Sequence, residues 1–164
     1  MQAADLLTLY DYNDWANRRI LNTAAKLTPA QFLAPTTLSK GSVRDVLVHM
    51  LGAEVVWRQR LQAGEAPTSL PAPADFPTLA VLTQRWQAEE AAMRAYVGAL
   101  SDEAVNAPLV YRSTKGVPYT EILWKILTHV VTHGTQHRAE VAHVLTGYGY
   151  SPGDMDFILF LREQ

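Results

Sequence analysis

The chain has 164 residues, of which 48% are hydrophobic and 18% are charged, and its formal net charge is −2. This length predicts one domain over residues 1–164, with a core that needs no disulfide. The small negative charge argues against nucleic-acid binding, and the absence of cysteine means that any metal must be held by nitrogen and oxygen ligands.

The chain carries no sequence signal for export or for membrane insertion. Residues 1–5 lack a basic segment, and no apolar run approaches the roughly 18 residues of a membrane span. We therefore expect a cytoplasmic protein with no membrane partner.

Apolar residues recur every three or four positions through most of the chain, a pattern that predicts an all-α fold. A first helix is expected over residues 3–26, and a short turn should begin at Thr28 and Pro29. A second helix is expected to open near Ser42, a capping residue, and to close at Gly64, a residue that commonly ends helices.

The second half of the chain predicts two more long helices. The proline-rich stretch 65–77 should be a surface loop, and a third helix should cover 78–100. Residues 108–118 have some extended character but are too few to build a sheet core. A fourth helix is expected over 119–146, and a final short helix over 157–161. Four long helices predict an antiparallel four-helix bundle with a short extra C-terminal helix.

His133 and His137 lie four residues apart in the fourth expected helix, only about 40° apart on its circumference. Both fall within the apolar stripe that includes Ile126, Val130 and Val144. A buried imidazole needs partners for its ring nitrogens, and one metal ion can satisfy two stacked rings. The pattern also fits two core histidines that are hydrogen-bonded to neighbours, so the spacing alone leaves metal binding open.

His49 is the candidate for a third ligand. It lies at the edge of the apolar face of the second helix, beside the small residues Gly52 and Ala53, which leave space for an ion. On its own it has the position of an ordinary boundary histidine. Three neutral nitrogens would leave a metal with one or more open positions, the usual arrangement of a reactive site.

The other two histidines are assigned to different roles. His129 falls about 40° from His133 at the margin of the stripe, so we expect it beside the site or at the surface. His143 falls about 240° from His137 and is assigned to solvent or to a subunit contact. The Glu-x-x-His pairs of di-iron bundles are absent, which favours a mononuclear site over one completed by Asp45, Glu54 and Glu140.

The aromatic and arginine residues near the expected site have ordinary structural interpretations. The aromatic side chains are assigned first to the core or an interface and only second to substrate contacts: Tyr10, Tyr12, Trp15, Trp57, Trp86 and Trp124. An anionic cofactor could contact Arg18, Arg19 or Arg138. The preferred interpretation of each is a solvated position on a helix.

Four segments resemble the DinB/YfiT-like family of metal-binding four-helix bundles, and the resemblance covers essentially the whole chain. These segments are 12–17, 42–49, 129–138 and 148–156. The resemblance implies that His49, His133 and His137 are the metal ligands. The chain departs from many relatives at Gln136, where a second histidine is common, and at Ala139 and Glu140, where Gly-Gln is common.

Members of that family with known activity include bacillithiol S-transferases and mycothiol-dependent isomerases. The resemblance therefore implies a divalent metal (zinc or nickel first, iron as a further choice), a low-molecular-weight thiol, a small-molecule substrate and a homodimer. A three-histidine metal can lower the pKa of a thiol and present it to an electrophile. A thiol S-transferase is the preferred function, and a metal-activated hydrolase or a noncatalytic metal-stabilised bundle remains open.

Overall fold

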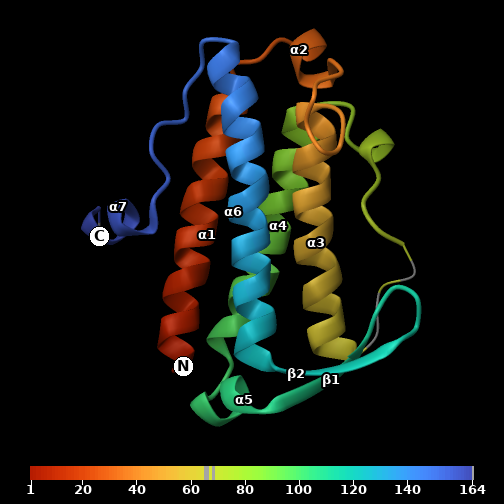
Figure 1. Cartoon of the computed structure of the whole chain (residues 1–164), viewed down its shortest axis with the longest axis vertical. Coiled ribbons are helices and arrows are strands. Elements are labelled where there is room, and N and C mark those ends of the chain that lie inside the picture. Colours follow the sequence, from red (N-terminus) through yellow and green to blue (C-terminus); the bar gives the residue numbers. More distant parts are fainter. Residues whose placement is uncertain (65–66, 68, 164) are drawn as a thin grey trace.

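Four long helices form the body of the molecule (Figure 1). The structure, a computed structural model, describes residues 1–64, 67 and 69–163. The long helices are α1 (Ala3–Ala24), α3 (Val43–Ala63), α4 (Leu79–Gly98) and α6 (Leu123–Gly147). Helices α1 and α6 run in one direction and α3 and α4 in the other (Figure 1). Each helix packs against its parallel partner and against one helix of the other pair, with α1 beside α4 and α3 beside α6. The predicted all-α four-helix bundle is confirmed.

The boundaries of α3 follow the signals in the sequence. The hydroxyl of Ser42 accepts a hydrogen bond from the backbone N–H of Asp45 at 3.1 Å, and the Asp45 carboxylate accepts one from the backbone N–H of Ser42 at 3.3 Å. This reciprocal capping satisfies two N–H groups at the start of the helix. Gly64 ends the helix with a φ of 75°, a left-handed conformation that glycine adopts without steric cost.

Shorter elements connect or follow the long helices: α2 (Pro29–Leu33), the 3₁₀ turn η1 (Pro73–Asp75), α5 (Asp102–Asn106) and α7 (Phe157–Arg162). The predicted short turn and the final short helix correspond to α2 and α7. Of the predicted proline-rich loop, residues 65, 66 and 68 lie outside the described residues. No helix formed by the described part of the chain is long and apolar enough to cross a membrane.

The prediction that the fourth helix begins at residue 119 is wrong. Pro118–Ile122 form strand β2, which pairs antiparallel with β1 (Pro108–Arg112), and α6 begins only at Leu123. Three of the five β2 residues are aromatic or β-branched, and Gly116 reverses the chain with a φ of 76°. The hydrogen-bonded hairpin therefore replaces the first turn of the expected helix. It lies across the end of the bundle, beside the C-terminal end of α3 (Figure 1).

A buried polar network joins all four long helices. The Glu54 carboxylate of α3 accepts hydrogen bonds from the side-chain amides of Asn13 (3.0 Å) and Asn17 (3.1 Å) on α1, and from the Trp86 indole (3.0 Å) on α4. Arg138 of α6 donates to the amide oxygens of the same two asparagines at 2.7 and 2.8 Å. The predicted solvated position of Arg138 is therefore wrong, because only 1% of this residue is exposed.

Gly134 makes room for this network on α6. A Cβ atom at this position would lie 2.9 Å from Nη1 of Arg138 and 3.0 Å from Oδ1 of Asn13. Both atoms are fixed by the hydrogen bonds of the network, so neither can retreat without breaking one. The close approach explains why a glycine lies between the two histidines of α6.

Replacing Gly134 with alanine should destabilise the protein by about 1–3 kcal/mol, because the added methyl group overpacks the network. The matched control is Gly147→Ala at the end of the same helix, where a Cβ would meet no atom within 4 Å. That variant should be neutral or slightly stabilising, since alanine is the better helix former. Urea denaturation followed by circular dichroism measures both. Equal stability of the two variants would contradict the packing argument.

Candidate metal centre

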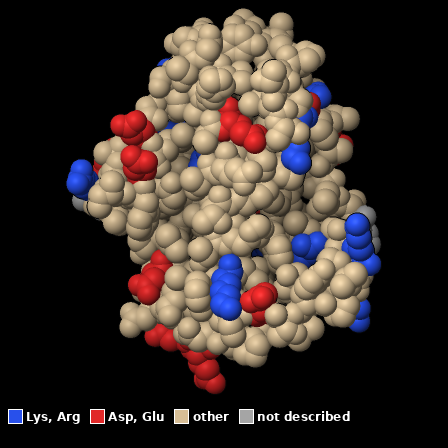
Figure 2. Space-filling model, in the orientation of Figure 1, with Lys and Arg blue, Asp and Glu red and all other residues tan. Residues whose placement is uncertain are grey.

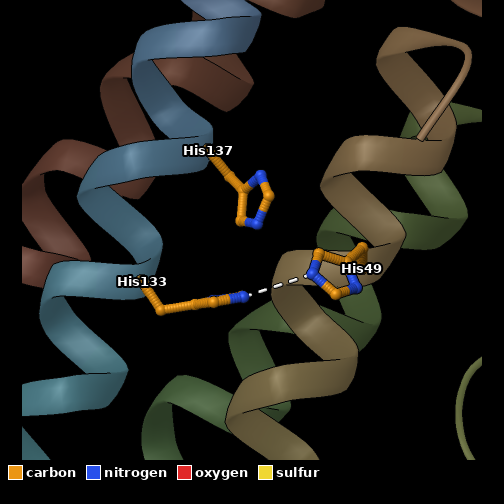
Figure 3. A group of neighbouring side chains, drawn as sticks. All are labelled: His49, His133 and His137. Atoms are coloured by element: carbon orange, nitrogen blue, oxygen red, sulfur yellow. Dashed lines mark hydrogen bonds between the residues drawn. The ribbon is translucent and has the colours of Figure 1, made fainter. Parts of the chain in front are cut away.

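The three predicted ligand residues meet between α3 and α6 (Figure 3). His49 reaches across from α3 to His133 and His137, which are one turn apart on α6. One ligand nitrogen from each lies within 4.8 Å of the other two, and Nε2 of His133 is 3.2 Å from Nε2 of His49. A tetrahedral metal about 2.0–2.1 Å from each of two nitrogens holds them roughly 3.3 Å apart. The three side chains are therefore placed so that they could bind one metal ion.

The electrostatic environment keeps two of these imidazoles neutral. Burial lowers the pKa of His49 to about 4, and electrostatic interaction with Lys40 and His137 lowers it further. Burial likewise lowers the pKa of His133 to about 4, assisted by His137 and His49. At neutral pH both rings therefore carry an unprotonated nitrogen, the form that binds a metal. Three imidazole donors suit a divalent transition metal such as zinc, nickel or iron.

Glu140 orients the third imidazole. Its carboxylate lies 3.2 Å from Nδ1 of His137 and accepts a hydrogen bond from the Ser39 hydroxyl at 2.7 Å. Partial burial raises the pKa of Glu140, but the hydrogen bonds with Ser39 and His137 lower it by more. The pKa of Glu140 therefore lies below its usual value. A carboxylate at Nδ1 keeps the proton on that atom and leaves Nε2 free to bind a metal. The His-x-x-Glu spacing on one helix face is the signal that identifies this role.

The other two histidines lie outside the cluster. His129 is exposed, with its ring centroid 5.9 Å from that of His133 and 5.6 Å from that of Trp57. It therefore lies beside the site, as predicted. His143 is exposed on α6, also as predicted. Within the ranges 1–64, 67 and 69–163, the group of nearby ligand side chains consists of the three histidines alone.

A cavity with a small excess of positive charge adjoins His49. It has a volume of about 450 Å³, and the charged residues of its lining are Lys40, Arg44 and Asp45. Arg44 lies 3.0 Å from the Asp45 carboxylate, so Lys40 supplies the excess positive charge. Arg138, by contrast, is occupied by the buried network, and Arg19 lies 3.4 Å from the Glu163 carboxylate near α7. The cationic groups nearest the site are therefore not those that the sequence suggested. On the face shown in Figure 2, charged side chains otherwise form small separate groups with uncharged surface between them.

Two carboxyl groups with raised pKa values, one buried and one half-buried, were not identified from the sequence. Burial, together with the charges of Glu90 and Glu54, raises the pKa of Asp14 to about 8. Burial and Glu54 raise the pKa of Glu90 to about 7. Asp14 follows an asparagine of the network on α1, and Glu90 lies on α4. Helical periodicity gives no sign of these shifts, because they depend on how α1, α3 and α4 pack together.

Comparisons with known proteins agree with the fold. A model of the DinB family matches residues 1–164. Protein DinB of Bacillus subtilis (strain 168) is 26% identical to this chain over 158 residues, which are 93% of this chain and 91% of that protein. A crystal structure of a conserved protein from Enterococcus faecalis covers 88% of this chain and 96% of its own, with a TM-score of 0.65 and 14% identity. That likeness is one of fold alone.

The contribution of Asp14 to the free energy of unfolding should fall as the pH rises from about 4 toward 8, because Asp14 keeps a proton in the folded state that the unfolded chain has already released. Each such proton contributes a slope of at most about 1.4 kcal/mol per pH unit. Asp14→Asn should remove part of this decline, as measured by urea denaturation at several pH values. Asp154→Asn, at an exposed position, is the control. Identical pH profiles for wild type and Asp14→Asn would contradict the prediction.

Proposed function

The chain belongs to the DinB family, and we propose that it is a divalent-metal-dependent enzyme of the thiol S-transferase type that acts on small electrophiles. His49, His133 and His137 are the proposed ligands of one metal ion, with zinc or nickel as the first choices and iron as a further one. The observation that carries the proposal is the convergence of three imidazoles from two helices on one point. The cavity beside His49 offers space for a small molecule next to one of these ligands.

A divalent metal held here would supply a Lewis acid that lowers the pKa of a thiol. The residues of the chain prepare the site for this chemistry. His49 and His133 are neutral, and Glu140 holds the proton of His137 at Nδ1. The positive charge of Lys40 favours an anion such as a thiolate near His49. In the overall reaction the thiol loses its proton to solvent, an S–C bond forms, and the leaving group departs with the electrons of its bond to carbon.

The number of protein ligands supports an enzyme over a purely structural site. Structural zinc sites are usually closed by four protein ligands, whereas catalytic sites keep a position open for water or substrate. The described residues bring three ligands together here. Glu140 contacts the far nitrogen of His137, so its carboxylate serves to orient that ring.

Replacing His133 with alanine should abolish both metal retention and thiol-transfer activity, while most of the helical circular dichroism remains. The helices owe their stability mainly to their apolar faces, whereas an open site depends on all three imidazoles. Metal content of untagged protein and a screen of thiols with electrophiles provide the two measurements. The matched control is His143→Ala, an exposed histidine of the same helix, which should keep both properties.

Two outcomes of this experiment would contradict the proposal. Full activity of His133→Ala without metal would exclude a metal-dependent reaction at this site. Loss of the helical signal when metal is removed from the wild-type protein would instead identify the ion as a structural element and favour the noncatalytic bundle.

We also propose that the chain forms a homodimer. Apolar side chains are exposed on α7, where Ile158 is 54% exposed, Leu161 42% and Phe157 37%. A symmetric contact between two copies would remove this surface from water. Light scattering at micromolar concentrations should give twice the chain mass of 18.2 kDa, and Ile158→Glu should lower it. Val110→Glu, at a 62% exposed position on the hairpin, should not. A monomeric mass for the wild-type protein would contradict the proposal.

A further inference from the structure

The region between α3, α6 and the β-hairpin lies beside the metal centre and is rich in aromatic side chains. His129 lies one turn before His133 on α6, and Trp57 lies two turns after His49 on α3. Because the two helices run in opposite directions (Figure 1), His129 and Trp57 both lie on the hairpin side of the metal centre. There the structure has a second cavity of about 450 Å³, lined by Trp57, Tyr111, Glu121, Lys125, Ile126 and His129.

Aromatic rings form the walls of this cavity. The Trp57 ring lies edge-to-face with Tyr111 at a centroid distance of 5.1 Å, and with His129 at 5.6 Å. The ring centroid of His129 is in turn 5.9 Å from that of His133. Neighbouring rings therefore connect Tyr111 of the hairpin to a proposed metal ligand. The guanidinium carbon of the buried Arg60 lies 4.9 Å from the Trp57 ring centroid. This contact helps to hold the indole in place.

The charged residues of the cavity neutralise each other. The Lys125 ammonium lies 3.5 Å from the Glu121 carboxylate, and both side chains are about half exposed at the rim. This ion pair gives the cavity no excess charge that would favour an ionic ligand. Aromatic walls favour a second planar ring, which can stack or approach edge-to-face and add about 0.5–1.5 kcal/mol beyond simple area burial.

We propose that this cavity is a binding subsite for an uncharged planar aromatic group. The further statement that this group belongs to the electrophilic substrate rests on the proposed function. With a ring bound against the Trp57 and Tyr111 rings, a reactive substituent extends past His129 toward His133. Aromatic electrophiles should then react faster than saturated ones of the same size, and Tyr111 becomes a specificity-determining residue on the hairpin.

The test is a titration of 1-naphthol into chelator-treated, metal-free protein, followed through the NMR signals of the histidine rings. The His129 signals should shift as the probe binds, and those of the exposed His143 should not. Tyr111→Ala should weaken binding roughly 2- to 10-fold, through loss of one aromatic contact. Val110→Ala is the matched control, because Val110 is the preceding residue of the same strand, points to the opposite face and is 62% exposed. It should bind as the wild type does.

Saturated 1-decalol, which has the same carbon skeleton but is not planar, should bind more weakly than 1-naphthol. Unmoved His129 signals, equal affinity of Tyr111→Ala and wild type, or equal affinity for the two probes would overturn the proposal. Because the titration needs no metal, it is independent of the proposed function. If wild-type protein retains no metal but binds 1-naphthol as expected, the subsite stands and the transferase proposal fails. Metal retention without 1-naphthol binding removes the subsite alone.

Discussion

The buried carboxyl group of Glu54 constrains the arrangement of the whole bundle. A buried carboxyl group destabilises the fold unless its oxygens have hydrogen-bond partners. Here α1 supplies two amides, α4 an indole N–H, and α6 the Arg138 guanidinium on the far side of the same amides. Each helix must therefore take one rotation and one height relative to α3. Since the proposed ligands lie on α3 and α6, the same network fixes the distance between His49 and the pair on α6.

The alternation of inward and outward groups on α6 follows from this constraint. Arg138 points into the network next to α1, while its neighbour His137 faces His49 of α3. Gly134 leaves the space that the guanidinium occupies, and so separates His133 from His137 with a residue that has no side chain. The ligand pair thus stands on a helix whose α1-facing side is held by the hydrogen bonds of Arg138 to Asn13 and Asn17. A rigid support of this kind allows imidazoles to keep a fixed separation.

Local signals in the sequence predict much of this arrangement. The capping residues of α3 act within one turn, and the spacing of His133 and His137 requires only a helix. The burial of Arg138 could not be predicted in this way, because helical-wheel reasoning assumed a single apolar stripe, whereas α6 packs against α1 as well as α3. The raised pKa of Asp14 depends similarly on Glu54 and Glu90, which lie on two other helices. Such effects come from tertiary packing, and periodicity carries no information about it.

The mispredicted hairpin has a consequence for the site. A helix that began at residue 119 would extend α6 by one turn and leave residues 108–112 without a partner strand. Pairing of Tyr111 with Tyr119 in the ladder instead places the Tyr111 ring beside Trp57 of α3. The same pairing leaves Lys125 and Glu121 at the rim, where they neutralise each other. The hairpin is too small to form a core, but it determines which groups line the cavity beside Trp57 and His129. The helices determine where the histidines meet.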